Sequence, residues 1–354
     1  MYYYILVLLL FSCFLLKNLN VKYGNSYLGI IQYIVFSTIF IVSSTRFSVG
    51  SDYFSYKEIF ENESPTEPLF SFVIFLTKLL GGNYSWFVAI IFCLSFGIKL
   101  FVFDRLSNTK GFFLCLMLFC SFYYIAYEMN GIRQGVAMSF SLLATYYAYK
   151  SKKIYFYASC LAAGLFHYTA FIFLPFYALL KIKLSKTSTI IICALCGILA
   201  MNNSFNFLTE SFTQIAGNGI ISYKIQNYTL ERVDENLLFS FSTVRRLFFF
   251  FLILFSYEKI EASERMKQIV FWGGFATIII YLLFSEVGYF SIRLSAYYRI
   301  IECIWLSYFP FVFQKKSTRY IIFAFYFAYS LLQIRSALSA ENHNLLPIQT
   351  VLFG

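Results

Sequence analysis

Long apolar runs, broken only by short polar clusters, fill almost the whole of this 354-residue chain. A helix that crosses the hydrocarbon core of a bilayer, about 30 Å thick, needs roughly 20 predominantly apolar residues. The chain is 60% hydrophobic and only 13% charged, which excludes a soluble domain, a coiled coil and a disordered protein. We therefore expect an all-α polytopic membrane protein in which residues 1–354 form a single integral membrane domain.

The apolar runs predict about 12 transmembrane helices. These candidate spans cover residues 1–16, 27–45, 84–102, 112–127, 132–149, 154–166, 168–180, 187–202, 243–257, 268–285, 300–313 and 320–334. The segment 68–80 is apolar but short and follows Pro68, so it predicts a re-entrant or interfacial helix, and whether it spans is left open. The run 154–180 is divided near His167, because one span would place the lysines at its two ends on opposite sides of the membrane.

Basic residues indicate the orientation, because Lys and Arg are enriched in the cytoplasmic loops of membrane proteins. The twelve spans bring most lysines to one side, which is predicted to be the cytoplasm: Lys17/Lys22, Lys99/Arg105/Lys110, Lys150/Lys152/Lys153, Lys181/Lys183/Lys186, Lys259/Arg265/Lys267 and Lys315/Lys316/Arg319. Both termini, the long loops 46–67 and 203–240 and the turn at His167 are then external. The net charge of +11 is scattered and forms no basic block, so membrane lipids rather than nucleic acid are the expected partner.

The external face is rich in arginine, which favours an anionic ligand there, because a guanidinium binds phosphate through a planar fork of donors. Arginines that only anchor helix ends are the structural alternative. A first polar cluster holds Arg46, Asp52 and Tyr56. Asp52 could act as a general base or hold a sugar hydroxyl, and Arg46 could bind phosphate or pair with Asp52.

A second cluster holds Arg133 and Gln134 at the start of the span 132–149. The helix dipole disfavours a cation in a first helical turn, so Arg133 requires an anionic partner, either Glu128 or a bound phosphate. His167 is the third feature: an ionisable residue at membrane depth is a functional candidate, and a neutral His satisfied by a carbonyl is the alternative.

The C-terminal half adds further arginines to the external face. Arg293 has no acidic residue three or four positions away, whereas Arg299 is followed by Glu302 at i+3 and could pair with it. Two arginines at the mouth of the span 243–257 are either phosphate ligands or anchors: Arg245 and Arg246.

At these residues the chain resembles the EpsG family of polytopic bacterial membrane proteins, which groups with the Wzy-type polymerases of O-antigen and capsular polysaccharide. The resemblance spans residues 40–180, and its motifs are Arg46-xxx-Gly50-x-Asp52-xxx-Tyr56, Glu67-Pro68, Arg133-Gln134, the Lys-rich turn 150–153, and Phe166-His167 with Ala170 and Pro175. It implies a multi-pass glycosyltransferase of the bacterial inner (plasma) membrane. Such an enzyme joins undecaprenyl-diphosphate-linked oligosaccharide repeat units into the polysaccharide of a capsule or lipopolysaccharide, with its active site facing the periplasm.

The implied reaction needs a base for the attacking sugar hydroxyl and cations for the departing diphosphate. His167 or Asp52 would be the base, and the sequence does not choose between them. The diphosphate would be held without a metal or cofactor by Arg133, Arg293, Arg299 and Arg46. Further candidates for binding the substrate are Gln134, Tyr56, Arg245 and Arg246. A chain-length regulator protein is a candidate partner.

Two other functions fit the same composition. A lipid-linked oligosaccharide flippase would need arginines along a path through the membrane and no base. A membrane O-acyltransferase would use a buried His together with an acyl donor.

Overall fold

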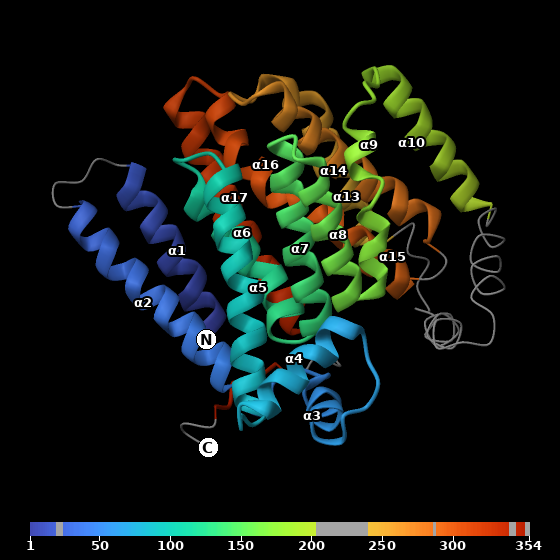
Figure 1. The fold of residues 1–354 in the computed structure, drawn as a ribbon. Coiled ribbons are helices and arrows are strands. Elements are labelled where there is room, and N and C mark those ends of the chain that lie inside the picture. Colours follow the sequence, from blue (N-terminus) through green and yellow to red (C-terminus); the bar gives the residue numbers. More distant parts are fainter. Residues whose placement is uncertain (19–23, 203–239, 286–287, 340–344, 351–354) are drawn as a thin grey trace. The chain divides into compact units, whose positions relative to one another are not determined.

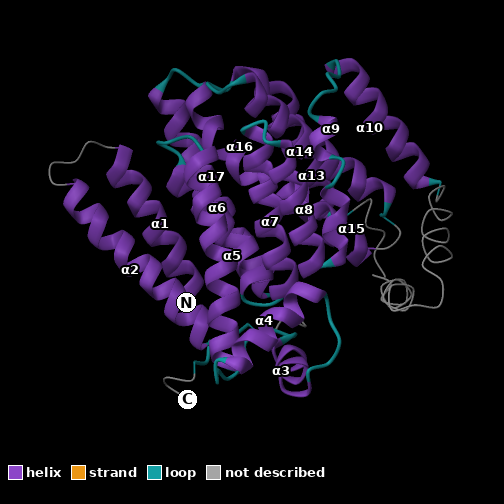
Figure 2. Ribbon diagram, in the orientation of Figure 1, coloured by secondary structure: helices purple, strands orange, loops and turns teal. Residues whose placement is uncertain are grey.

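The computed structural model describes residues 1–18, 24–202, 240–285, 288–339 and 345–350, and these are helical with no β-sheet (Figures 1 and 2). One isolated bridge pairs Arg46 with Thr350. The predicted all-α class is confirmed for this part of the chain. The contacts divide the chain into two compact units, the first comprising Met1–Phe171 with Cys303–Gly354 and the second Ile172–Glu302. The single membrane domain stays a prediction.

The first unit is built mainly of helices that run past one another in antiparallel pairs (Figure 1). Its elements are α1 (Tyr2–Asn18), α2 (Gly24–Thr45), α3 (Tyr53–Asn62), α4 (Pro68–Leu79), α5 (Tyr84–Leu106), α6 (Phe112–Tyr123), the π-helical turn η1 (Tyr124–Glu128), α7 (Ile132–Tyr149), α8 (Lys153–Phe166), the 3₁₀ turn η5 (Phe309–Val312) and α17 (Lys316–Leu338). The chain passes between the units within the 3₁₀ turn η2 (Tyr168–Phe173) and within α16 (Ile301–Tyr308).

Helix α7 is the centre of the polar region, packing against α8 on one side and α5 on the other. Because α7 and α8 are joined by a tight turn at residues 150–152, the start of α7 lies at the same end as the end of α8. Helix α4 packs against both α5 and α8. The residues that open α4, open α7 and close α8 therefore meet at one end of the unit.

The same end also receives Tyr2 and Gln349, which are described residues near the two ends of the first unit. The Tyr2 hydroxyl lies 3.0 Å from the Tyr124 hydroxyl, and the Phe47 amide donates to the Gln349 carbonyl over 2.9 Å. This arrangement agrees with the prediction that the termini, the segment 46–67 and the turn at His167 share a face. Which side of the membrane that face occupies stays a prediction.

The second unit is organised around α14 (Glu264–Leu283), which contacts α10, α13 and α15. Its other elements are α9 (Phe176–Leu179), α10 (Lys186–Met201), α13 (Phe241–Ser256), the 3₁₀ turn η4 (Tyr257–Lys259) and α15 (Gly288–Arg299). Lys186 pairs with Glu258 over 2.5 Å, and this hydrogen bond lowers the pKa of that exposed carboxyl. Almost all of the predicted loop 203–240 lies outside the described residues.

Four described helices are long and apolar enough to cross a membrane: Leu28–Thr45, Tyr84–Leu106, Glu264–Leu283 and Lys316–Leu338. Most of the other predicted spans coincide with shorter apolar helices, so the total of about 12 stays a prediction. The short helix expected at 68–80 is α4, and the break expected near His167 is present between α8 and η2. Helices α3 and α15 were not predicted, because their mixed polarity resembles that of a loop.

Candidate functional site

A buried carboxylate joins the two strongest candidates of the first unit. Glu67 Oε1 lies 3.1 Å from His167 Nδ1, and Glu67 Oε2 accepts a hydrogen bond from an Arg133 guanidinium nitrogen over 2.9 Å. Glu67 is only 1% exposed and His167 is also buried. The three residues come from the starts of α4 and α7 and from the end of α8.

The local sequence explains how each member reaches this point. Pro68 begins α4, a position where its missing amide proton is not needed, so Glu67 takes the N-cap position in an extended conformation. His167 closes α8 and is itself extended, and its amide still donates to the Ala163 carbonyl over 2.9 Å. The break at His167 thus turns the imidazole out of the helical repeat toward the start of α4.

Arg133 lies in the first turn of α7, where an anionic partner was expected. Glu67 is that partner, and the alternative that Glu128 compensates Arg133 is wrong. The guanidinium carbon also lies 5.4 Å from the centre of the Tyr56 ring and 5.9 Å from that of Phe70. These rings hold the side chain, whose Nε is buried without a hydrogen-bond partner among the described residues.

Arg46 is a buried cation whose described partners include no carboxylate. It is 4% exposed, and its guanidinium donates to the main-chain oxygens of Ser43, over 3.1 Å, and Glu128, over 2.9 Å. Its Nε has no partner within the part of the chain that is described. The alternative in which Arg46 pairs with Asp52 is therefore not observed among the described contacts. A desolvated charge without a counter-charge is costly, so this position favours an anionic ligand.

The segment that follows Arg46 lies directly on the turn that precedes Arg133. Asn130 Oδ1 accepts hydrogen bonds from the Ser51 hydroxyl over 3.1 Å and from the Asp52 amide over 3.2 Å. Gly50 has a φ of +97°, and a Cβ there would approach the Met129 oxygen to 2.7 Å, so only glycine fits this contact. Arg46 and Arg133 consequently flank the same turn, residues 128–131.

The other candidates of the first cluster are in supporting positions. Asp52 is half-buried at the N-cap of α3, where a carboxylate is favoured by the helix dipole, and its side chain accepts from the Ser51 hydroxyl over 3.2 Å. Tyr56, one turn later, is buried against Arg133. Gln134 is buried in α7 next to Arg133.

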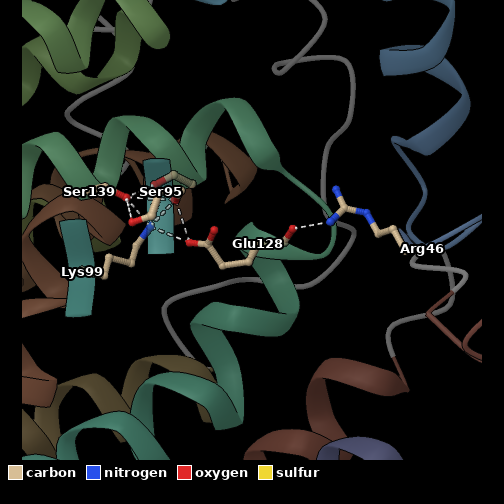
Figure 3. A network of polar contacts seen from close by, with 6 residues as sticks. Arg46, Ser95, Lys99, Glu128 and Ser139 are labelled. Atoms are coloured by element: carbon tan, nitrogen blue, oxygen red, sulfur yellow. Dashed lines mark hydrogen bonds and ion pairs between the residues drawn. The ribbon is translucent and has the colours of Figure 1, made fainter. Parts of the chain in front are cut away.

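A second, fully buried polar network lies between α5 and α7 (Figure 3). Lys99 Nζ is 2.5 Å from Glu128 Oε1, 2.6 Å from the Ser139 hydroxyl and 2.8 Å from the Ser95 hydroxyl. Lys99 was expected among the cytoplasmic lysines, but it is completely buried and paired. A buried, paired lysine gives no information about topology. The cytoplasmic position was expected because Lys99 lies near the end of the predicted span 84–102.

The remaining arginine candidates lie in the second unit. Arg246 of α13 donates to the Ser242 hydroxyl and stacks on the Tyr281 ring, 3.9 Å from its centre. Arg246, Arg299 and Glu302 line a cavity of about 20 Å³, together with Tyr298, Thr277 and residues of α13 and α14. Arg299, Arg245 and Arg246 all lie in the electrostatic neighbourhood of the Glu302 carboxylate, and the expected pairing of Arg299 with Glu302 stays a prediction. Arg293 is half-buried in α15.

Two residues of the first-unit networks were missed as site candidates. Glu67 enters the sequence prediction only through the Glu67-Pro68 motif, although a carboxylate immediately before an apolar helix is a signal for a buried partner of Arg133 and His167. The topology prediction places Lys99 with the cytoplasmic lysines, although Lys99 lies inside the predicted span 84–102, and this was the signal that it could be intramembrane.

Comparison with known proteins identifies the family of this chain. No curated protein and no solved structure matches the chain. The EpsG family matches residues 29–350, a range that includes Arg46, Glu67, Arg133 and His167 as well as the arginines of the second unit. The chain therefore belongs to the EpsG family.

Proposed function

We propose that this EpsG-family protein is a glycosyltransferase that joins lipid-linked oligosaccharide repeat units into a surface polysaccharide. A sugar hydroxyl of one repeat unit attacks C1 of the growing chain; the new glycosidic bond forms as the bond between C1 and the lipid diphosphate breaks. The hydroxyl proton goes to a base, and undecaprenyl diphosphate leaves with the electron pair. Family membership supports a role in polysaccharide synthesis at a membrane.

The observation that carries the proposal is the bridge from His167 through Glu67 to Arg133. A carboxylate that accepts a hydrogen bond from Nδ1 of an imidazole fixes the ring and its tautomer, so that Nε2 takes the proton. Asp52 has no such arrangement among the described residues, and it occupies the N-cap position of α3 without a side-chain capping hydrogen bond. The contacts therefore favour His167 as the base.

The leaving diphosphate needs positive charge that strengthens its binding as the bond breaks. Arg46 is the best placed for this role, because its buried charge meets only carbonyl oxygens among the described residues. Arg133 supplies a second guanidinium, oriented by Glu67 and by the rings of Tyr56 and Phe70. Both flank residues 128–131, which suits two cations for two phosphate groups.

The second unit offers an additional basic cluster. Arg245, Arg246 and Arg299 lie in the electrostatic neighbourhood of Glu302. We assign this cluster, with Arg293, to contacts with the anionic parts of the substrate. Gln134 and Tyr56 are assigned to the first-unit site beside Arg133.

Deletion of the gene tests the function directly. The surface glycan should collapse from a ladder of lengths to a single repeat unit, and lipid-linked repeat units should accumulate on the outer face of the membrane. Accumulation on the cytoplasmic face would instead identify a flippase. A complete ladder that lacks acyl groups would identify an O-acyltransferase, and an unchanged glycan would end the proposal.

A further inference from the structure

The buried network around Lys99 includes neither Glu67 nor His167, and the proposed reaction does not use it. An ammonium and a carboxylate that are both removed from solvent are expensive at membrane depth, where such residues usually have a function. Lys99 Nζ is surrounded by four oxygens, those of Glu128, Ser95, Ser139 and the Gly135 main chain. The ammonium of Lys99 is thus fully satisfied by oxygen acceptors.

Glu128 ends a π-helical turn, and its side chain and its main-chain oxygen contact different residues. Residues Tyr124–Glu128 form a π-helical turn, and the Met129 amide donates to the Tyr124 carbonyl over 3.0 Å. Such turns are rare and occur frequently at functional sites. The Glu128 side chain points toward Lys99, while its main-chain oxygen accepts the hydrogen bond of Arg46 over 2.9 Å (Figure 3).

Arg46 depends strongly on this one carbonyl. Its only other described hydrogen bond goes to Ser43, three residues earlier on the same chain segment. The Glu128 carbonyl is therefore the contact that fixes Arg46 relative to α7 and hence to Arg133. The same residue whose carbonyl binds Arg46 is held through its side chain by Lys99.

We propose that the Lys99–Glu128 ion pair is a positioning device that, through the main-chain oxygen of Glu128, holds Arg46 in place to bind the leaving diphosphate. The inference rests on the proposed function for the identity of the ligand. The coupling of the ion pair to Arg46 can be tested without knowing the ligand.

The test removes both charges together, with Lys99→Met and Glu128→Gln in the full-length chain. The paired change leaves no single buried charge, and the amide can still accept the hydrogen bond of Ser95. Ser141→Ala is the matched control, because this buried α7 hydroxyl donates only to the Ala137 carbonyl, over 3.1 Å. Each variant is measured for abundance in the membrane and for polymerised glycan, both alone and combined with Arg46→Lys.

We expect the paired variant to lower polymer roughly tenfold or more at normal abundance, the effect of losing one hydrogen bond to a charged group. In the Arg46→Lys background it should add less than a further twofold, since both changes remove the same interaction. The same fold loss in both backgrounds would mean a merely structural role and would overturn the proposal. If the paired variant does not accumulate in the membrane, Ser139→Ala replaces it, because this change removes only one oxygen around Lys99. Ser139→Ala is then measured alone and combined with Arg46→Lys.

Hydrogen exchange of the purified protein separates this inference from the proposed function. The paired variant should speed exchange in residues 124–131 and 46–52, and Ser141→Ala should not. Unchanged exchange in both segments would overturn the coupling, whatever the protein polymerises. A gene deletion without effect on glycan would refute the function while leaving this measurement valid.

Discussion

Glu67 Oε1 and His167 Nδ1 lie 3.1 Å apart although the two residues are 100 positions apart in the chain. The other oxygen of the same carboxylate holds Arg133. One buried carboxylate thus contacts an imidazole and a guanidinium at the same time, and single substitutions can test this double contact.

His167→Ala should reduce polymer by about 10²–10⁴-fold, the usual contribution of a general base, while the protein remains in the membrane. Asp52→Asn is the comparison, and we expect a smaller loss, because it keeps the N-cap position of α3. The lengths of the glycan ladder and the membrane abundance of each variant are the measurements. A normal ladder from His167→Ala would remove it from the mechanism, and a loss only in Asp52→Asn would transfer the base to Asp52.

Glu67→Gln should also be severe, because an amide cannot serve both partners. If its oxygen faces His167, its NH₂ faces the donors of Arg133; in the other orientation the NH₂ faces Nδ1 and favours the tautomer whose Nε2 is already protonated. Glu63→Gln is the control, since Glu63 is exposed and pairs with Lys78 at the surface over 2.8 Å. Ladders of equal length from the two variants would show that the buried bridge is not needed for polymerisation.

Arg46→Lys and Arg133→Lys should each reduce polymer about 10–150-fold, which corresponds to the loss of about 1.5–3 kcal/mol from one charge-assisted hydrogen bond. Lysine keeps the charge but cannot reproduce the planar fork of donors. Arg335→Lys, in the last turn of α17, should be silent because this side chain is exposed. If all three variants gave the same ladder as the unchanged protein, the arginines would be anchors and the diphosphate site would be abandoned.

The orientation can be tested with reporter fusions after residues 110, 152 and 185, all of which should be cytoplasmic. A fusion after residue 63, between α3 and α4, should report the periplasm, because this segment lies at the end that carries Glu67 and His167. Periplasmic signals at two of the three cytoplasmic positions would reverse the orientation and place the proposed site on the wrong face for external polymerisation.

Helix positions could be read from apolar runs, and the span 132–149 agrees with α7 at both ends. The partners of the charged residues could not be predicted from the sequence, because they depend on which helices pack together. Arg133 required an anion on electrostatic grounds alone, yet choosing Glu67 over the nearer Glu128 needed the packing of α4 against α8. Glu128 does not pair with Arg133, because its side chain pairs with Lys99 at the end of a π-helical turn. The local sequence does not predict this π-helical turn.

Gly135→Ala tests whether the close packing of α7 against the π-helical turn matters. A Cβ at Gly135 would lie 2.5 Å from the Tyr127 main-chain oxygen, so the backbone of one element would have to move. Such overpacking costs about 1–3 kcal/mol, and it would also displace the Gly135 carbonyl that contacts Lys99.

The matched control is Gly97→Ala on the exposed face of α5, where a Cβ would meet nothing within 4 Å. Alanine there should raise the free energy of unfolding by about 0.5–1 kcal/mol, because glycine is a poor helix former. Thermal unfolding in one detergent should therefore move in opposite directions for the two variants, and only Gly135→Ala should shorten the glycan ladder. An unfolding temperature for Gly135→Ala at or above that of the unchanged protein would show that α7 and the turn are not in close contact.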